Sequence, residues 1–173
     1  QEYLARRLPE EYLRKQLRVI DLYEKMGVRS TLTCTPYYLR QPQRSCHLAW
    51  SESSAVVYAN SVLGSWTNRE GGPSALAAAL IGKTPNYGVH KVENREASIL
   101  IKVESSLRNE TDFGVLGIHV GELLRNEVPV FDGLLNYTED DLKQLGAGLA
   151  SSGMTTIFPV SYTHLRAHET VLD

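Results

Sequence analysis

Cysteines, long apolar runs and an excess of either charge are scarce or absent in this sequence. Its 173 residues include only two cysteines, which are too few for a disulfide framework. No stretch approaches the roughly 20 apolar residues that a membrane-spanning helix needs. The formal net charge is −2, and no basic cluster offers a surface for nucleic acid. We therefore expect no nucleic-acid or membrane partner and a cytoplasmic location.

The remaining composition is that of an ordinary globular protein. Hydrophobic residues make up 42% and charged residues 22% of the chain, and its length suits one domain. The first residues, Gln1-Glu2-Tyr3, show neither an initiator methionine nor a signal-peptide pattern. We interpret them as the interior of a longer gene product.

Helical and strand-like patterns alternate along the chain. Apolar residues spaced by three or four positions, together with small-residue segments, predict helices over 10–26, 51–63, 74–81, 112–125 and 139–149. Apolar and β-branched runs predict short strands over 28–35, 97–103, 128–131 and 154–158. This alternation indicates an α/β fold with a largely parallel sheet.

The stretch 47–73 is unusually rich in short polar side chains. A solvated helix face is usually coated by Lys and Glu, whereas hydroxyls and amides suit a concave site that orients a small polar ligand. Arg69 could hold a carboxylate or phosphate with its planar guanidinium. The glycines of the stretch would let the backbone approach a ligand closely.

Each of these polar residues also has a purely structural interpretation. Ser51 and Ser53 could cap a helix. Ser54, like Asn60 and Ser61, could instead satisfy a tight contact between helices. Arg69 and Glu70 could form a surface ion pair.

Residues 77–84, Ala-Ala-Ala-Leu-Ile-Gly-Lys-Thr, fit a relaxed phosphate-loop pattern. A true phosphate loop leaves a strand and opens a helix, so that free N–H groups face the phosphate. Here the pattern ends an alanine-rich helix, and Pro85 follows at once. The inverted context argues against nucleotide binding.

Cys34 lies in the block Thr33-Cys34-Thr35-Pro36-Tyr37, at the end of a predicted strand. A side chain there can face a cleft, but a single cysteine is more often a small buried apolar residue than a ligand. An iron–sulfur cluster needs several thiolates or equivalent ligands. The residues alone leave both interpretations open.

Residues 159–173 continue none of these patterns. They resemble a peptide that arises when sequencing-adaptor DNA is translated, although a natural C-terminal tail is the alternative. We expect them to be a non-native tail that packs poorly.

Several ordered blocks resemble the aconitase X family of hydro-lyases. They are Thr33–Tyr37, the stretch from His47 through Ala59-Asn60-Ser61-Val62-Leu63-Gly64, Thr67–Pro73, Tyr87–His90, and Leu145 through Ser151-Ser152-Gly153. The resemblance spans about residues 10–158. It implies that residues 1–158 are a partial catalytic domain, a fragment of an aconitase-like three-layer α/β/α domain.

The same resemblance implies a dehydratase that removes water from a small hydroxy acid, such as cis-3-hydroxy-L-proline or mevalonate 5-phosphate. An iron–sulfur cluster would act as Lewis acid, with Cys34 as one of its ligands. The other expected partner is a small swivelling domain or subunit, which would carry the catalytic serine. The substrate-binding candidates are His47, Ser53, Ser54, Asn60, Thr67, Asn68 and Arg69.

Two positions depart from the family pattern. Cys46 replaces a usual glycine, so no ligand role is carried onto it. Ser65-Trp66 replaces a usual Ala-Arg, which removes one positive charge near the expected substrate anion. We expect the fragment to be inactive by itself. Two alternatives remain open: a non-catalytic binding module of the same fold, and an unrelated α/β protein that binds a small ligand.

Overall fold

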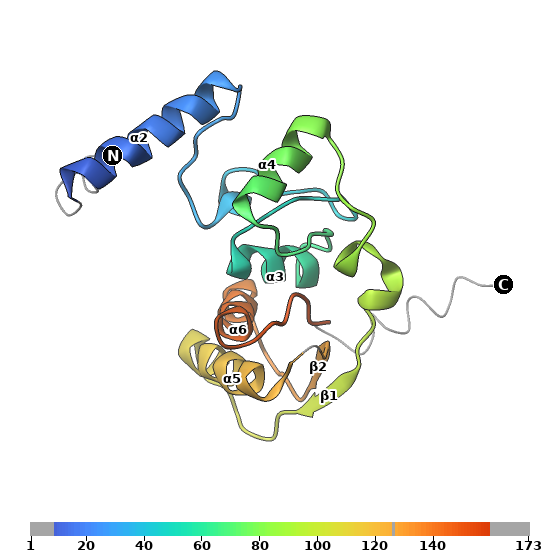
Figure 1. The fold of residues 1–173 in the computed structure, drawn as a ribbon. Helices are drawn as coiled ribbons and strands as arrows, with labels where there is room; N and C mark the ends of the chain where they lie inside the picture. Colours follow the sequence, from blue (N-terminus) through green and yellow to red (C-terminus); the bar gives the residue numbers. More distant parts are fainter. Residues whose placement is uncertain (1–8, 126, 160–173) are drawn as a thin grey trace. The chain divides into compact units, whose positions relative to one another are not determined.

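The computed structural model describes residues 9–125 and 127–159, and the chain divides into two units, residues 1–34 and 35–173. The described residues of the first unit, 9–34, contain one helix, α2 (Glu10–Lys25), as its apolar periodicity predicts (Figure 1). Ion pairs from Glu11 to Lys15 and from Asp21 to Lys25 support it at the i,i+4 spacing. Gly27 follows the helix with φ of +89°, a left-handed conformation that suits glycine.

The strand predicted over residues 28–35 is wrong. The structure has an irregular segment there, followed by a single turn of 3-10 helix, η1 (Pro36–Tyr38). β-Branched composition measures how well side chains fit a pleated, partly buried surface. No strand in the described part of the chain pairs with these residues, so the composition does not produce a strand.

The second unit holds the remaining elements. In chain order after η1 they are α3 (Ser53–Ser61), α4 (Gly72–Ile81), η2 (Gly88–His90), η3 (Val92–Asn94), β1 (Ile99–Lys102), α5 (Glu110–Leu123), β2 (Pro129–Asp132) and α6 (Glu139–Ser152). The four helices predicted in this unit and the strands predicted near 97–103 and 128–131 are therefore confirmed.

Local chemistry fixes the helix ends. The side chains of Asn109 and Thr138 cap α5 and α6, and Asp141 completes a capping box with Thr138. Glu52, rather than Ser51 or Ser53, caps α3 by accepting a hydrogen bond of 2.7 Å from the backbone N–H of Ala55.

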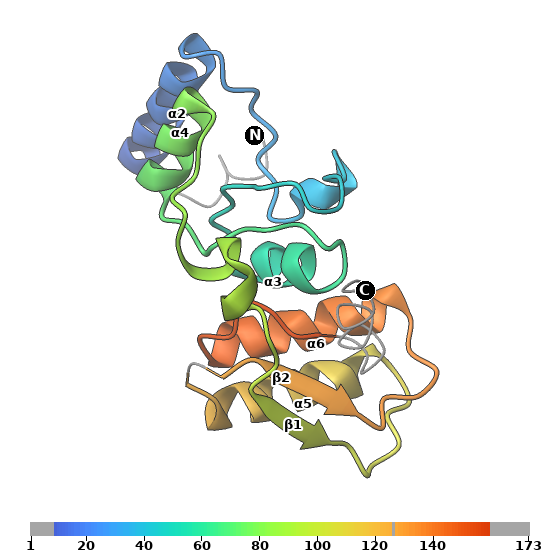
Figure 2. The same cartoon turned by 90° about the vertical axis from the view of Figure 1, so that its right-hand side faces the viewer.

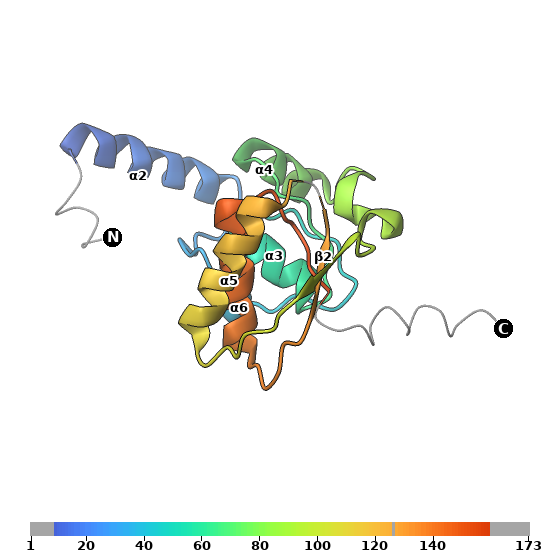
Figure 3. The same ribbon diagram turned by 90° about the horizontal axis from the view of Figure 1, so that it is seen from below.

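The two strands pair in parallel, with Ile99 opposite Pro129 and Lys102 opposite Asp132. Helix α5 connects them, and α5 and α6 lie on the same side of both strands (Figures 1 and 3). The βαβ connection and the parallel pairing confirm the α/β class and the parallel sheet predicted from the alternation of elements.

The strand predicted over residues 154–158 is also wrong, although its burial was anticipated. Ile157 and Phe158 are buried, but the segment is irregular. Side chains of α3 hold its backbone: Asn60 donates to the carbonyl of Thr156 at 2.9 Å, and the N–H of Phe158 donates to Ser61 Oγ at 2.9 Å. These bonds replace the partner strand that a ladder would need.

Helix α6 lies between α3 and α5 (Figures 1 and 2). Apolar residues from all three helices form the core with Phe131 of β2 and with Phe158, whose rings meet edge to face at 5.9 Å. Of the predicted tail, Pro159 is partly buried and residues 160–173 lie outside the described residues.

Glycines let α5 and α6 approach each other backbone to backbone. A Cβ on Gly117 would overlap the carbonyl oxygen of Leu145, and a Cβ on Gly148 would lie 2.5 Å from the carbonyl oxygen of Gly114. Neither clash can be relieved by rotating a side chain, because the obstructing atoms belong to the backbone.

We predict that Gly117→Ala lowers the free energy of unfolding by roughly 1–3 kcal/mol, because the two helices must separate. Gly114→Ala on the same helix is the matched control. Its Cβ would meet only Gln144 Cβ at 3.9 Å, so its higher helix propensity should raise stability by up to about 1 kcal/mol. Urea unfolding of both variants measures the difference, and equal destabilisation would contradict the close-packing argument.

Candidate functional site

Among the described residues of the second unit, we consider two pockets. The first, which we call the tyrosine pocket, has a volume of about 400 Å³ and is lined by residues that include Tyr37, Tyr38, Ser54, Tyr58, Asp140 and Lys143. The second, the alanine pocket, has a volume of about 370 Å³ and is lined by residues that include His47, Trp50, Ala75, Ala78, Lys83 and Thr84. Both volumes suit small molecules.

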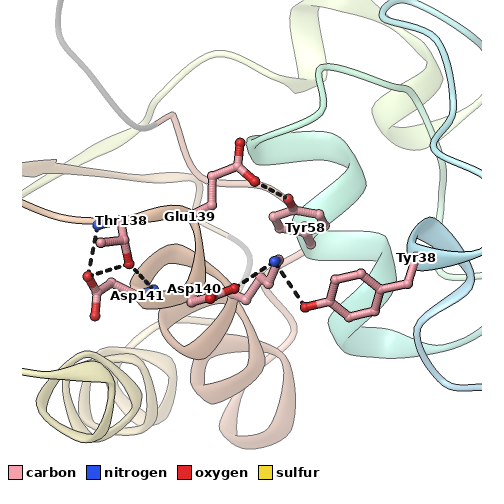
Figure 4. A network of polar contacts seen from close by, with 7 residues as sticks. Tyr38, Tyr58, Thr138, Glu139, Asp140 and Asp141 are labelled. Atoms are coloured by element: carbon pink, nitrogen blue, oxygen red, sulfur yellow. Dashed lines mark hydrogen bonds and ion pairs between the residues drawn. The ribbon is translucent and has the colours of Figure 1, made fainter.

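Lys143 lines the tyrosine pocket and contacts Asp140 and Tyr38, which are labelled in Figure 4. Its Nζ donates to Asp140 Oδ1 at 2.7 Å and to the hydroxyl of Tyr38 at 3.0 Å. It also lies 4.8 Å from the ring centre of Tyr38 and 5.2 Å from that of Tyr58. The hydrogen bonds to Asp140 and then Tyr38 raise the pKa of Lys143, so the ammonium stays charged.

Tyr37 and Tyr58 are neutral groups in this pocket. Burial raises the pKa of Tyr58 to about 12, and its hydroxyl donates to Glu139 Oε2 at 3.2 Å. Tyr37 packs between Tyr38 and Tyr58 with tilted rings, whose centres lie 4.8 and 4.6 Å away, and burial raises its pKa too. Sequence analysis missed this cluster, because no local pattern connects Lys143 with tyrosines about a hundred residues earlier.

Asn60 and Thr67 are buried and bonded to each other. The Asn60 amide donates to the carbonyl oxygens of Thr67 and Thr156, while its oxygen accepts from the N–H of Thr67 at 2.9 Å. Arg95 adds bonds to the side-chain oxygen and the carbonyl of Asn60. Asn60 is only 3% exposed and Thr67 is fully buried, so both side chains stabilise the fold through their bonds to buried backbone groups.

Arg69 also faces the protein interior. Its Nη2 donates to the carbonyl oxygens of Ala150 at 3.4 Å and Thr155 at 3.2 Å, and burial lowers its pKa. Its Nε is buried without a hydrogen-bond partner among the described residues. The surface ion pair considered for Arg69 and Glu70 does not form, since Glu70 accepts from Ser74 Oγ instead.

Asn68 fixes the backbone of η2. Its side chain donates to the carbonyl of Tyr87 at 3.0 Å and accepts from the N–H of Val89 at 2.9 Å. Gly88 between them has φ of +58°, and a Cβ there would overlap the Asn68 side chain. Only glycine fits this close approach.

The seven substrate-binding candidates do not line one pocket. Ser54 lines the tyrosine pocket and His47 the alanine pocket, while Ser53 begins α3. The side chains of the other four bond to backbone groups: Asn60, Thr67, Asn68 and Arg69. Their role toward a substrate stays a prediction. Cys34 belongs to the first unit and is a free thiol.

His47 and His90 form a close pair beside the alanine pocket. Their Nδ1 atoms are 2.8 Å apart and their rings are stacked at 5.1 Å. His90 is 6% exposed, and its Nε2 is buried without a partner among the described residues. Burial, then His47, lowers the pKa of His90, whereas Glu70 opposes the shift.

The described residues bring together no group of three or more His, Cys, Asp or Glu side chains that could hold a metal ion. Within the same residues, no helix is both long and apolar enough to cross a membrane.

Comparison with known proteins connects these elements to one family. A model of the aconitase X first domain matches residues 1–93, and a model of the aconitase X second domain matches residues 97–164. The chain belongs to the aconitase X family. The resemblance predicted from the ordered sequence blocks is thus confirmed, and an unrelated small-ligand protein is excluded.

Relatives in this family include proteins from archaea and fungi. The chain is 47% identical to the phosphomevalonate dehydratase large subunit of Thermococcus kodakarensis, over 95% of this chain and 43% of that protein. It is 35% identical to the cis-3-hydroxy-L-proline dehydratase of Hypocrea jecorina, over 90% of this chain and 27% of that protein.

A crystal structure of the holo form of Thermococcus kodakaraensis aconitase X shares the fold. Its TM-score is 0.84 at 49% sequence identity, and the match covers 88% of this chain and 40% of that one. The chain therefore spans about two fifths of the length of the Thermococcus proteins and about a quarter of that of the Hypocrea jecorina dehydratase. The alanine pocket lies within the matched first domain, whereas residues of both matched domains line the tyrosine pocket.

The depressed pKa of His90 predicts a pH-dependent stability. The ordinary histidine pKa is 6.5 and the folded-state value is lower, so the unfolded chain binds the proton first as the pH falls. The stabilisation is complete above about pH 6.5 and decreases as the pH falls toward the folded-state pKa. Urea unfolding between pH 5 and 7.5 should show this slope, and His90→Gln should remove it. His119→Gln, on an exposed position of α5, should keep it.

Lys143→Met should lower the free energy of unfolding by roughly 1–3 kcal/mol, because it removes two charge-assisted hydrogen bonds and the cation–π contacts. Lys91→Met is the control, since Lys91 only approaches Glu93 at 3.6 Å on the surface. Thermal unfolding of both variants measures the effect. Equal, negligible losses would mean that Lys143 is not a structural anchor.

Proposed function

We propose that the protein to which this chain belongs is a hydro-lyase that removes water from a small hydroxy acid. The chain belongs to the aconitase X family, and relatives named for two chemically different substrates are both dehydratases. An iron–sulfur cluster would supply a Lewis acid for the departing hydroxyl.

The identities favour a phosphorylated substrate. The chain is 47–51% identical to phosphomevalonate dehydratase large subunits of two archaea, against 35–37% for cis-3-hydroxy-L-proline dehydratases. Mevalonate 5-phosphate is therefore the first substrate to test, and cis-3-hydroxy-L-proline the second. The words "large subunit" in the relatives' names support a small swivelling domain or subunit as partner.

The replacement of Ala-Arg by Ser65-Trp66 removes a positive charge from the sequence, but the structure supplies another one at the same place, which weakens the argument for a non-catalytic module. Ser65 is fully buried and donates to the carbonyl of Gln43 at 3.2 Å. The guanidinium of Arg95 lies 4.3 Å from the ring centre of Trp66. Arg95 thus places a positive charge beside Trp66, where the family pattern has an arginine of its own.

The described residues do not by themselves fit an iron–sulfur cluster. They offer two free thiols, Cys34 and Cys46, and no group of three metal ligands. We propose Cys34 as one ligand, with the others outside this chain.

Cys34→Ser in the full-length protein should abolish the visible iron–sulfur absorbance and lower the bound iron, because one thiolate ligand is lost. Cys46→Gly is the matched control, since the Cys46 side chain only contacts the carbonyl of its neighbour His47. Absorbance and iron content report on cluster binding directly, whether or not the variant is active. Full iron occupancy in Cys34→Ser would show that Cys34 is not a ligand.

The activity itself is tested with the full-length protein and its small partner. Loss of water from mevalonate 5-phosphate or from cis-3-hydroxy-L-proline is followed by NMR. Turnover of either compound supports the hydro-lyase. Binding of both without turnover, in protein with full iron content, would favour a non-catalytic module.

A further inference from the structure

The two pockets differ in the charges on their walls. Glu110 and Asp140 line the tyrosine pocket, so the charge of Lys143 is offset there. The alanine pocket has Lys83 and His47 on its wall and no carboxylate. A small anion is therefore better matched to the alanine pocket.

Lys83 is available to a ligand. It follows Gly82, which ends α4 in a left-handed conformation with φ of +64°. Lys83 is exposed and has no ion-pair partner within the described part of the chain. The carboxyl end of α4 carries partial negative charge and repels an anion. The electrostatic attraction of an anion to this pocket therefore comes from Lys83 and not from the helix. In this respect the site differs from a phosphate loop.

The histidine pair sets which hydrogen-bonding group His47 presents. Because its Nδ1 faces His90, only its Nε2 remains for a ligand in the pocket. If His47 donated across the pair, the proton of His90 would lie on the buried Nε2, which has no acceptor among the described residues. An unpaired buried N–H is costly, so donation from His90 Nδ1 is favoured. His47 then carries its proton on Nε2, as a donor toward the pocket.

We propose that the alanine pocket binds the oxyanion of a small carboxylate or phosphate. Lys83 is its counter-ion, the Nε2–H of His47 and the hydroxyl of Thr84 are donors, and Trp50 with the alanines of α4 covers the apolar part of the ligand. His90 is a positioning residue that acts through His47. The identity of the oxyanion as part of a hydroxy acid rests on the proposed function, but the binding needs neither cluster nor partner.

The test is a calorimetric titration of the 173-residue chain with inorganic phosphate and, separately, with L-lactate as a small hydroxy carboxylate. Saturable binding is expected, and the tighter of the two anions identifies the phosphate or the carboxylate as the group that the pocket prefers. Lys83→Met should weaken binding by at least about tenfold. Lys91→Met, at a partly exposed lysine that does not line the pocket, should leave it unchanged.

The positioning role of His90 has its own readout. His90→Leu should weaken binding, whereas His90→Gln should restore much of it, because an amide N–H can still donate to His47.

The proposed anion site is wrong if the chain binds neither anion, or if Lys83→Met binds them as tightly as the unchanged chain does. If the chain binds the anion but the full-length protein dehydrates no hydroxy acid, the proposed function fails and the site stands. If the enzyme is active and Lys83→Met changes neither binding nor KM, the site fails and the function stands.

Discussion

The buried amide of Asn60 joins segments that are far apart in the sequence. It bonds to the backbone at Thr67 and Thr156, and Arg95 bonds to its oxygen. Thr156 lies in the second matched aconitase X domain and Asn60 in the first, so this amide connects the two. Ser61 and Arg69 add further bonds from first-domain side chains to second-domain backbone. Removing the amide would leave several buried backbone groups without partners.

This connection explains why the dense polar stretch 47–73 resembles a ligand site. Short hydroxyl and amide side chains are what a concave ligand site needs, and they are equally what an irregular buried backbone needs. Asn60 and Arg69 satisfy carbonyl groups of the irregular segment at Thr155 and Thr156, and the hydroxyl of Thr67 accepts from the N–H of Trp50. Sequence alone does not show whether a polar group will face a ligand or a loop.

The parts of the fold that could be predicted depend on local sequence patterns, whereas the parts that could not depend on contacts between distant residues. Helices and the pair β1–β2 follow from local periodicity and local apolar runs, so they were predicted within a few residues. The segments near 28–35 and 154–158 have strand-like composition, but a strand also needs a neighbour. The tyrosine pocket depends on Lys143 meeting Tyr38 and Tyr58, a contact between distant residues that no local pattern records.

The contact between α5 and α6 has a consequence for how this protein can change over time. At Gly117 and Gly148 the two backbones touch with no side chain between them. Every possible replacement of glycine adds atoms, so mutation can only push the helices apart. Elsewhere in a core, a loss of volume at one position can be offset by a gain at its neighbour. This compensation is impossible at Gly117 and Gly148, because both residues already lack a side chain beyond hydrogen. Substitutions that preserve this helix contact must therefore fall at positions other than Gly117 and Gly148.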